Sequence, residues 1–112
     1  MQEHKIVLTV EAIYDLADIA DYIEMTFGIE RADKFQNDMR KQIKDLELLG
    51  KVFSKTHIYY RNYSIYKKIF SPSIIFYIVK EPEKELHILR ILREERDLGK
   101  IITKQYQYTY PE

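Results

Sequence analysis

The stretch Ile74-Ile75-Phe76-Tyr77-Ile78-Val79 decides the fold. Its six residues are apolar without a break, and segments rich in turn-forming residues flank it at 71–73 and 81–85. A strand with one buried face alternates apolar and polar residues, whereas a strand covered on both sides is apolar throughout. We therefore predict a central β-strand over 74–80 that is covered on both faces.

Strand-like segments lie on both sides of this stretch. Residues 63–70 alternate in the period of two that is typical of a strand, and residues 86–92 form a third, largely aliphatic strand. Because the connections between the three are short, we predict an antiparallel meander. Residues 51–58 are predicted to form a loop, residues 93–99 a polar helical turn, and the tail with Tyr106, Tyr108 and Tyr110 a strand-like extension.

The first half of the chain has helical periodicity instead. A short strand is expected at 4–9, with Thr9 as the N-cap of a helix from Val10 to about Thr26. Gly28 should end this helix, and a second should run from about Glu30 to Leu49. The two should pair antiparallel as an outer layer over the sheet. We expect the acidic residues of the first helix on the face opposite its apolar stripe: Glu11, Asp15, Asp18, Asp21 and Glu24.

Composition excludes several classes of protein. The 112 residues contain no cysteine, which rules out disulfides, thiolate nucleophiles and Cys-ligated zinc. Three scattered histidines, His4, His57 and His87, do not suggest a metal site, and no cofactor is implied. No apolar run approaches the roughly 20 residues of a membrane span, so we expect a soluble, cytoplasmic protein.

The net charge of zero conceals an asymmetry between the two halves. Residues 1–50 carry 6 basic and 11 acidic side chains, a balance of −5, and residues 51–112 carry 12 and 7, a balance of +5. The basic half could serve an anionic partner, or the two halves could simply neutralise each other within the fold. On charge alone, both interpretations stay open.

Two segments carry a resemblance to a known family. The first is Thr9-Val10-Glu11-Ala12 followed by Asp15-Leu16 and Ile19-Ala20-Asp21-Tyr22-Ile23, and the second is Leu86 to Asp97, in which an aliphatic strand leads through Arg90 to Arg96-Asp97. Together with the order of elements over residues 4–98, they resemble the RelE/ParE superfamily of toxins from bacterial type II toxin–antitoxin systems, which includes plasmid-stabilisation proteins.

The resemblance implies an α+β fold of the order β-α-α-β-β-β, with an N-terminal strand and an antiparallel two-helix hairpin packed on a twisted antiparallel sheet. We expect a single domain over 1–112, with its core at about 4–98 and a C-terminal extension at 99–112. The resemblance also implies a cognate antitoxin, and either a toxin homodimer or a toxin–antitoxin hetero-oligomer. We expect a preformed groove for an antitoxin helix or strand.

RelE-like members cut messenger RNA in the ribosome, and ParE-like members inhibit DNA gyrase. Metal-free RNA cleavage needs a base, cations for the phosphate oxygens and an acid. The candidate catalytic residues are Arg90, Arg93 and Lys68, with His87 or Tyr106 as proton donors. The candidate binding residues are Arg61, Lys67 and Arg96. Stacking on bases is the alternative to a core role for Tyr59, Tyr60, Tyr63 and Tyr66.

Arg90 has two interpretations. Because one face of the sheet must take the helices, Arg90 either lies on the open face, where it would contact phosphate or an antitoxin carboxylate, or forms a structural ion pair with Asp97 or a helix acid. Lys67 and Lys68 should lie on opposite faces at a solvated strand edge.

One departure from RelE-like enzymes affects the functional hypothesis. Those enzymes usually open the central strand with Tyr-Arg or His-Arg, and here the segment from Ser73 to Tyr77 has no arginine. The sequence therefore favours a ParE-like toxin that inhibits growth by binding a large target such as DNA gyrase. A RelE-like endonuclease and a non-toxic partner-binding module are the alternatives.

Overall fold

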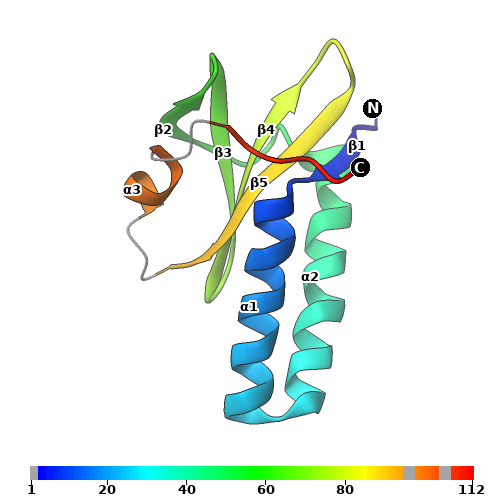
Figure 1. Cartoon of the computed structure of the whole chain (residues 1–112). Coiled ribbons are helices and arrows are strands. Elements are labelled where there is room, and N and C mark those ends of the chain that lie inside the picture. Colours follow the sequence, from blue (N-terminus) through cyan, green and yellow to red (C-terminus); the bar gives the residue numbers. More distant parts are fainter. Residues whose placement is uncertain (1–2, 95–97, 104–106) are drawn as a thin grey trace.

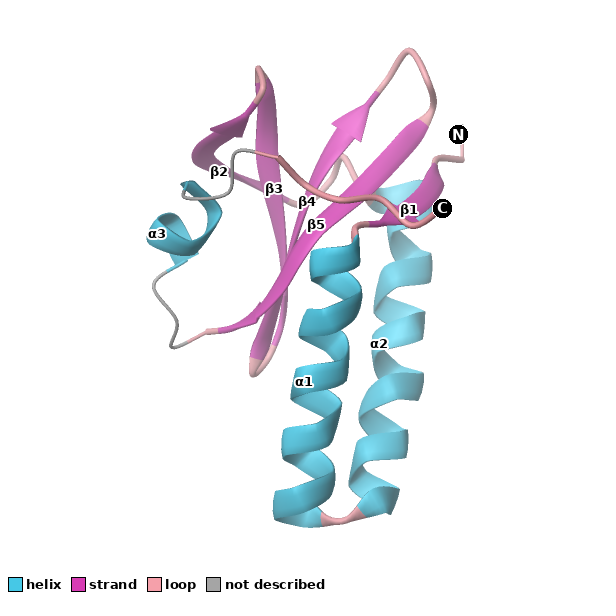
Figure 2. Ribbon diagram, viewed as in Figure 1, coloured by secondary structure: helices cyan, strands magenta, loops and turns pink. Residues whose placement is uncertain are grey.

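The computed structural model describes residues 3–94, 98–103 and 107–112. Figures 1 and 2 show a two-helix hairpin packed against a twisted five-stranded sheet. The element order confirms the predicted α+β class, with the bounds β1 (Lys5–Leu8), α1 (Val10–Phe27), α2 (Ile29–Leu49), β2 (Ser54–Tyr60), β3 (Tyr63–Phe70), β4 (Ser73–Lys80), β5 (Glu85–Arg93) and α3 (Leu98–Thr103).

The helix hairpin forms where the periodicity predicts it. The Thr9 side chain accepts a hydrogen bond of 3.0 Å from the Ala12 amide and caps α1. Gly28 has φ +99°, a conformation that other residues rarely adopt. It is the single residue between the end of α1 and the start of α2. The two helices therefore lie side by side and antiparallel (Figure 1).

The sheet has the strand order β1-β5-β4-β3-β2. The meander β3-β4-β5 is antiparallel as predicted, but β1 pairs parallel to β5, so the sheet is mixed. The hairpin and strands β2, β3 and β4 all lie between β1 and β5 in the sequence, which is far more chain than a parallel pair requires. Within the described ranges, no helix is both long and apolar enough to span a membrane.

The loop predicted at 51–58 is wrong, because Ser54–Tyr60 forms the edge strand β2. Its register against β3 shifts between Lys55 and Tyr59, and the Thr56 hydroxyl donates to the Ile65 carbonyl over 2.7 Å. An edge strand with one solvated face and an irregular register has a weak apolar signal. That explains why the sequence alone did not indicate it.

Both faces of β4 are buried, as the uninterrupted apolar run predicts. Ile75 and Tyr77 face the hairpin and join the first core, with Met39 and Leu46 of α2 and Ile88 of β5. The opposite side of the sheet, called here the far face, has a second apolar cluster of Ile65, Ile74, Phe76, Ile78, Leu89, Leu92 and Tyr108. The sheet therefore separates two cores.

The variant Gly50→Ala tests how closely the hairpin packs against the sheet. A Cβ at this position would overlap the buried Leu86 side chain and lie 3.0 Å from the Leu46 carbonyl oxygen. Gly50→Ala should therefore lower the free energy of unfolding by about 1–3 kcal/mol, as overpacking does. The exposed neighbour variant Lys51→Ala should change it by less than about 0.5 kcal/mol. Urea unfolding of both variants measures this, and equal stabilities would contradict it.

Candidate functional site

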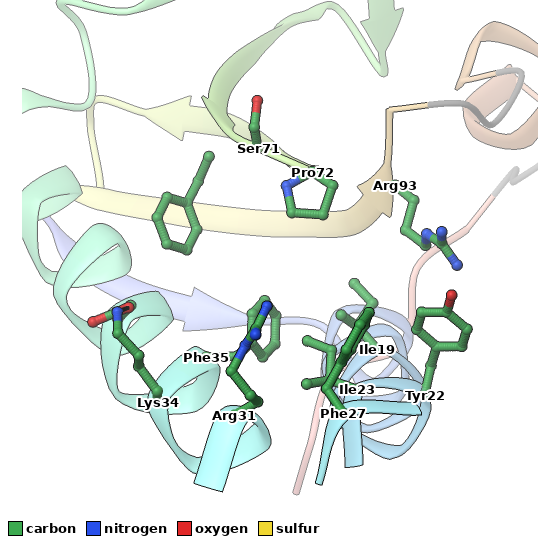
Figure 3. A pocket seen from close by; sticks show the side chains of 12 residues that line it. Ile19, Tyr22, Ile23, Phe27, Arg31, Lys34, Phe35, Ser71, Pro72 and Arg93 are labelled. Carbon is green, nitrogen blue, oxygen red and sulfur yellow. Dashed lines mark hydrogen bonds and ion pairs between the residues drawn. The ribbon is translucent and has the colours of Figure 1, made fainter. Parts of the chain in front are cut away.

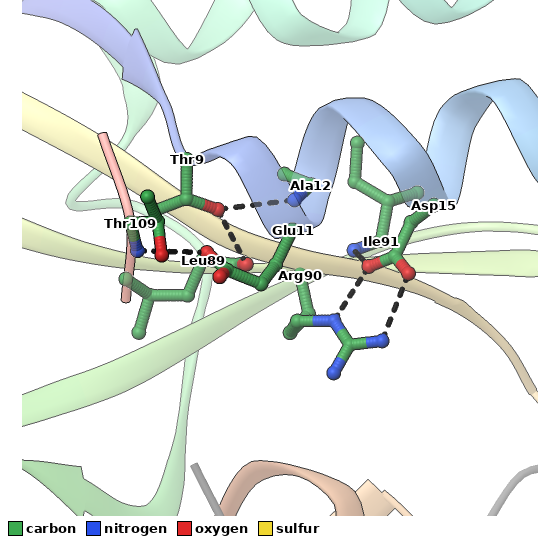
Figure 4. Close-up of polar contacts among 8 residues, drawn as sticks. All are labelled: Thr9, Glu11, Ala12, Asp15, Leu89, Arg90, Ile91 and Thr109. Carbon is green, nitrogen blue, oxygen red and sulfur yellow. Dashed lines mark hydrogen bonds and ion pairs between the residues drawn. The ribbon is translucent and has the colours of Figure 1, made fainter. Parts of the chain in front are cut away.

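A charged pair joins α1 to β5 at the centre of the molecule. The Arg90 Nε and Nη2 atoms donate to the two carboxylate oxygens of Asp15 over 2.7 and 2.8 Å, and the Ile91 amide donates to Asp15 Oδ2 over 3.0 Å (Figure 4). The hydrogen bond to Asp15 raises the pKa of the Arg90 guanidinium above its usual value. Such a bidentate pair is both stronger and more directional than a simple ion pair.

A bulge in β5 places the arginine. Arg90 pairs with Phe76, but Ile88 pairs with Tyr77, so Leu89 is the extra residue. The bulge lets Leu89 join the far-face cluster while Ile91 packs toward the hairpin. Arg90, between them, is thus positioned to reach the helix.

Asp15 was expected on the solvent-facing side of α1, and this is wrong. Asp15 is only 9% exposed. It lies between the buried residues Ala12 and Ile19, on the face of α1 that packs against the sheet. The spacing 12, 15, 19 could have shown that an acid interrupts the apolar stripe, which is a signal for a buried partner. Of the two interpretations of Arg90, the ion pair with a helix acid agrees with this geometry.

Lys68 lies far from this pair, beneath α2. Its Nζ donates to the Gln42 carbonyl over 2.9 Å, lies 3.7 Å from Asp45 Oδ2 and sits over the Phe53 ring. Only 6% of Lys68 is exposed, so it is not on a solvated edge as expected. Burial lowers the pKa of its ammonium, although Asp45 opposes the shift. Lys67 is half-buried and points to the other face of β3.

Among the candidate cations that the structure describes, Arg93 lies near Arg90. Its guanidinium lies 4.6 Å from the Tyr22 ring centre, and it lines with Arg90 a crevice of about 260 Å³ between α1 and β5. Arg61 lies in the β2–β3 turn, stacked over Tyr60. Arg96 falls outside the described residues. The structure thus brings Arg90 and Arg93 together, and places Lys68, Lys67 and Arg61 elsewhere.

The far face of the sheet is covered, not open. Tyr108 from the C-terminal segment is 3% exposed and packs in the far-face cluster, edge to face with Tyr60 at 5.0 Å between ring centres. Tyr60 and Tyr63 flank this cluster, whereas Tyr59 is exposed. The open sheet face considered for Arg90 is therefore covered in the described part of the chain.

His87, a candidate proton donor, is buried and has a partner on each ring nitrogen. Nε2 lies 2.9 Å from Glu85 Oε1, and Nδ1 lies 2.7 Å from the Tyr110 hydroxyl. Tyr106, the other candidate donor, falls outside the described residues. Across residues 3–94, 98–103 and 107–112, no three His, Asp or Glu side chains are grouped so that they could hold a metal ion.

A groove lies between the helix hairpin and the β3–β4 turn, a position that the sequence did not indicate for the expected groove. It encloses about 370 Å³, and Figure 3 shows Tyr22, Ile23 and Phe27 of α1 and Phe35 of α2 along its wall. Three cations stand at its rim: Arg31, which lies over Phe27; Lys34, which pairs with Asp38 at 2.7 Å; and Arg93. The apolar stripes of both helices continue past the sheet, and that excess length was the available signal.

The described geometry can now be compared with known proteins. Residues 6–98 match the family described as the ParE toxin of the type II toxin–antitoxin system parDE. The chain belongs to the ParE toxin family. Among curated proteins, none matches the sequence significantly.

Two solved structures share the ParE fold of this chain. A chain of the chromosomal ParDE toxin–antitoxin system from P. aeruginosa is 26% identical, with a TM-score of 0.70, and the match covers 83% of this chain and 98% of that one. A chain of the RelBE2 toxin–antitoxin complex from Mycobacterium tuberculosis is 17% identical, with a TM-score of 0.52, and the match covers 85% and 97%. The second similarity concerns the fold alone.

The Asp15–Arg90 pair should be a main support of this ParE fold. Asp15→Ala leaves the guanidinium and the Ile91 amide without their acceptor, and we expect the free energy of unfolding to fall by about 3 kcal/mol. The matched control is Asp18→Ala, which removes an exposed acid one turn along α1 and should cost less than about 0.5 kcal/mol. If urea denaturation finds the two variants equally stable, the pair is not a main support.

Proposed function

We propose that this ParE-family protein is a toxin that binds and inhibits a large target such as DNA gyrase and performs no hydrolysis itself. The observation that carries the proposal is the spatial separation of its cations. Arg90 of β5 is held by Asp15 of α1, and Lys68 of β3 is buried under α2, with β4 between the two strands. Phosphoryl chemistry requires such groups to converge on one substrate.

The two histidine contacts support the same conclusion. A general acid or base must reach a proton on the substrate, within hydrogen-bonding distance. His87 is buried and hydrogen-bonded through both nitrogens, to Glu85 and Tyr110. His87 is thus not placed to exchange a proton with a substrate, and we infer that the crevice lined by Arg90 and Arg93 serves binding rather than cleavage.

A supercoiling assay with purified gyrase tests the target. At micromolar concentrations the protein should inhibit supercoiling of relaxed plasmid, and induction in cells should arrest growth while translated messages stay intact in primer extension. Unchanged supercoiling would contradict the gyrase proposal. Cleavage of messages in the ribosomal A site would replace it with the RelE-like alternative, and induction without growth arrest would favour a non-toxic binding module.

We further propose that the groove between the hairpin and the β3–β4 turn accepts a helix of the cognate antitoxin. The apolar wall with Tyr22, Ile23 and Phe35 suits the apolar face of an amphipathic helix, and the cations at the rim suit carboxylates on its flanks. The similarity to a chain of the ParDE system supports an antitoxin as the partner.

Charge reversal at Arg31 tests the groove, and charge reversal at Lys44 serves as its control. Both are exposed on α2, but only Arg31 lines the groove. Arg31→Glu should weaken binding of the antitoxin about tenfold at low salt through lost charge complementarity, and Lys44→Glu should leave the dissociation constant nearly unchanged. Calorimetric titration at two salt concentrations measures this. Equal affinities for both variants, or binding by the wild type that salt does not weaken, would contradict the proposed site.

A further inference from the structure

The C-terminal residues 107–112, called here the strap, run in extended conformation across the far face of the sheet. Figure 1 shows the strap crossing β5 and ending beside β1. The family match stops at residue 98, the first residue of α3, so the rest of α3 and the whole strap lie outside the part of the chain that matches ParE toxins. All residues of the far-face cluster except Tyr108 lie within the matched part. The cluster is thus covered by a segment that lies outside the family match.

Contacts of Tyr108, Thr109 and Tyr110 hold the strap. The Thr109 carbonyl accepts from the Val10 amide over 2.7 Å, and the Thr109 amide donates to Glu11 Oε1 over 2.9 Å. The Tyr108 ring fills the far-face cluster, and its amide donates to the Tyr60 hydroxyl over 3.3 Å. At the end, the Tyr110 hydroxyl meets His87.

His87 connects Glu85 to the Tyr110 hydroxyl through two hydrogen bonds whose directions can be assigned. Glu85, whose pKa is held below its usual value by the hydrogen bond from His87, is a carboxylate and only accepts. In the neutral imidazole, Nε2 therefore carries the proton toward Glu85, and Nδ1 accepts from the Tyr110 hydroxyl. The hydrogen bond from the Tyr110 hydroxyl to His87 thus holds the end of the strap.

The strap is attached more weakly than the strands beneath it. The hydrogen bonds of Tyr108, Thr109 and Tyr110 do not belong to a sheet ladder, whereas β4 and β5 pair along their length. The buried Tyr108 hydroxyl has no hydrogen-bond partner among the described residues. A buried, unpaired hydroxyl regains water on opening, so the closed strap bears a penalty that an open strap does not. Detachment of the strap should thus precede unfolding of the sheet.

We propose that the strap is an autoinhibitory segment, which covers the far face in the resting protein and must detach before that face can engage the target. The inference rests on the proposed function, since it concerns the same inhibition of a large target. Detachment uncovers an apolar and aromatic surface formed by Tyr60, Phe76, Ile78 and Leu89, next to Arg90. Such a patch is typical of a protein-binding site.

The Val10 amide reports the strap directly. It is the first residue of α1 and donates to Thr109, so it is protected from hydrogen exchange only while the strap is closed. The Thr9 amide, one residue earlier, donates to the Ile88 carbonyl and reports the sheet instead. Comparing the two amides separates detachment of the strap from unfolding.

Two single-atom variants move the strap in opposite directions. Tyr108→Phe removes the unpaired hydroxyl and should raise protection of the Val10 amide about tenfold. Tyr110→Phe removes the bond to His87 and should lower it about fivefold. The Thr9 amide should keep its wild-type protection in both. Because only the open fraction engages the target, the half-inhibitory concentration for gyrase should rise about tenfold for Tyr108→Phe and fall about fivefold for Tyr110→Phe.

The outcomes are distinct. Changes in Val10 protection without parallel changes in the half-inhibitory concentration, or with a change of that concentration in the opposite direction, would overturn autoinhibition and leave the proposed toxin function intact. Unchanged Val10 protection in both variants would overturn the proposed attachment of the strap. If no form inhibits gyrase, the proposed target is wrong, and the same variants ranked by growth arrest in cells decide on the strap. Equal arrest by all would refute it.

Discussion

The ion pair between Asp15 and Arg90 is the constraint on which the rest of the structure depends. It connects the two layers of the fold, since Asp15 lies on the buried face of α1 and Arg90 on the β5 strand. Its position fixes the line along which the hairpin lies over the sheet. The groove opens further along α1 on the helix side (Figure 3), and the strap crosses β5 on the other side (Figure 1).

The same pair explains why a basic half need not form a catalytic centre. Acids of the first half meet bases of the second half in the pairs Asp15 with Arg90 and Asp45 with Lys68, so part of the charge asymmetry is neutralised within the fold. Other cations lie over aromatic rings, as Arg61 does over Tyr60. Cations distributed in this way stabilise the fold and its surfaces but do not converge on a phosphate. This distribution agrees with the proposed toxin that acts by binding.

Most of the fold could be predicted from periodicity, because its elements bury whole faces. The central strand is apolar on both sides, and the hairpin helices carry long apolar stripes ended by Gly28 and Gly50. Strand β2 was missed because an irregular edge strand with polar residues leaves little apolar pattern. Local signals therefore suffice where burial is continuous and fail where a strand is held mainly by its neighbour.

The site was harder to predict, because it depends on contacts between residues far apart in the chain. A helix acid was one of the partners considered for Arg90, but Asp15 was placed with the solvent-facing acids, although it sits in the apolar stripe. Coverage of the far face by Tyr108 depends on the path of the chain after residue 98, which no local pattern gives. The roles of Arg93, Arg61, Lys67 and Arg96 remain proposals.

The central claim is that Arg90 positions the hairpin through Asp15 and does not act on the target with its charge. The most direct measurement is growth arrest by the double variant Asp15→Asn with Arg90→Gln, compared with the wild type at equal expression and with its folding checked by urea unfolding. The two introduced amides can hydrogen-bond each other, and the amide oxygen at position 15 can still accept from Ile91. The account predicts that growth arrest is retained. A folded double variant that no longer arrests growth would contradict it.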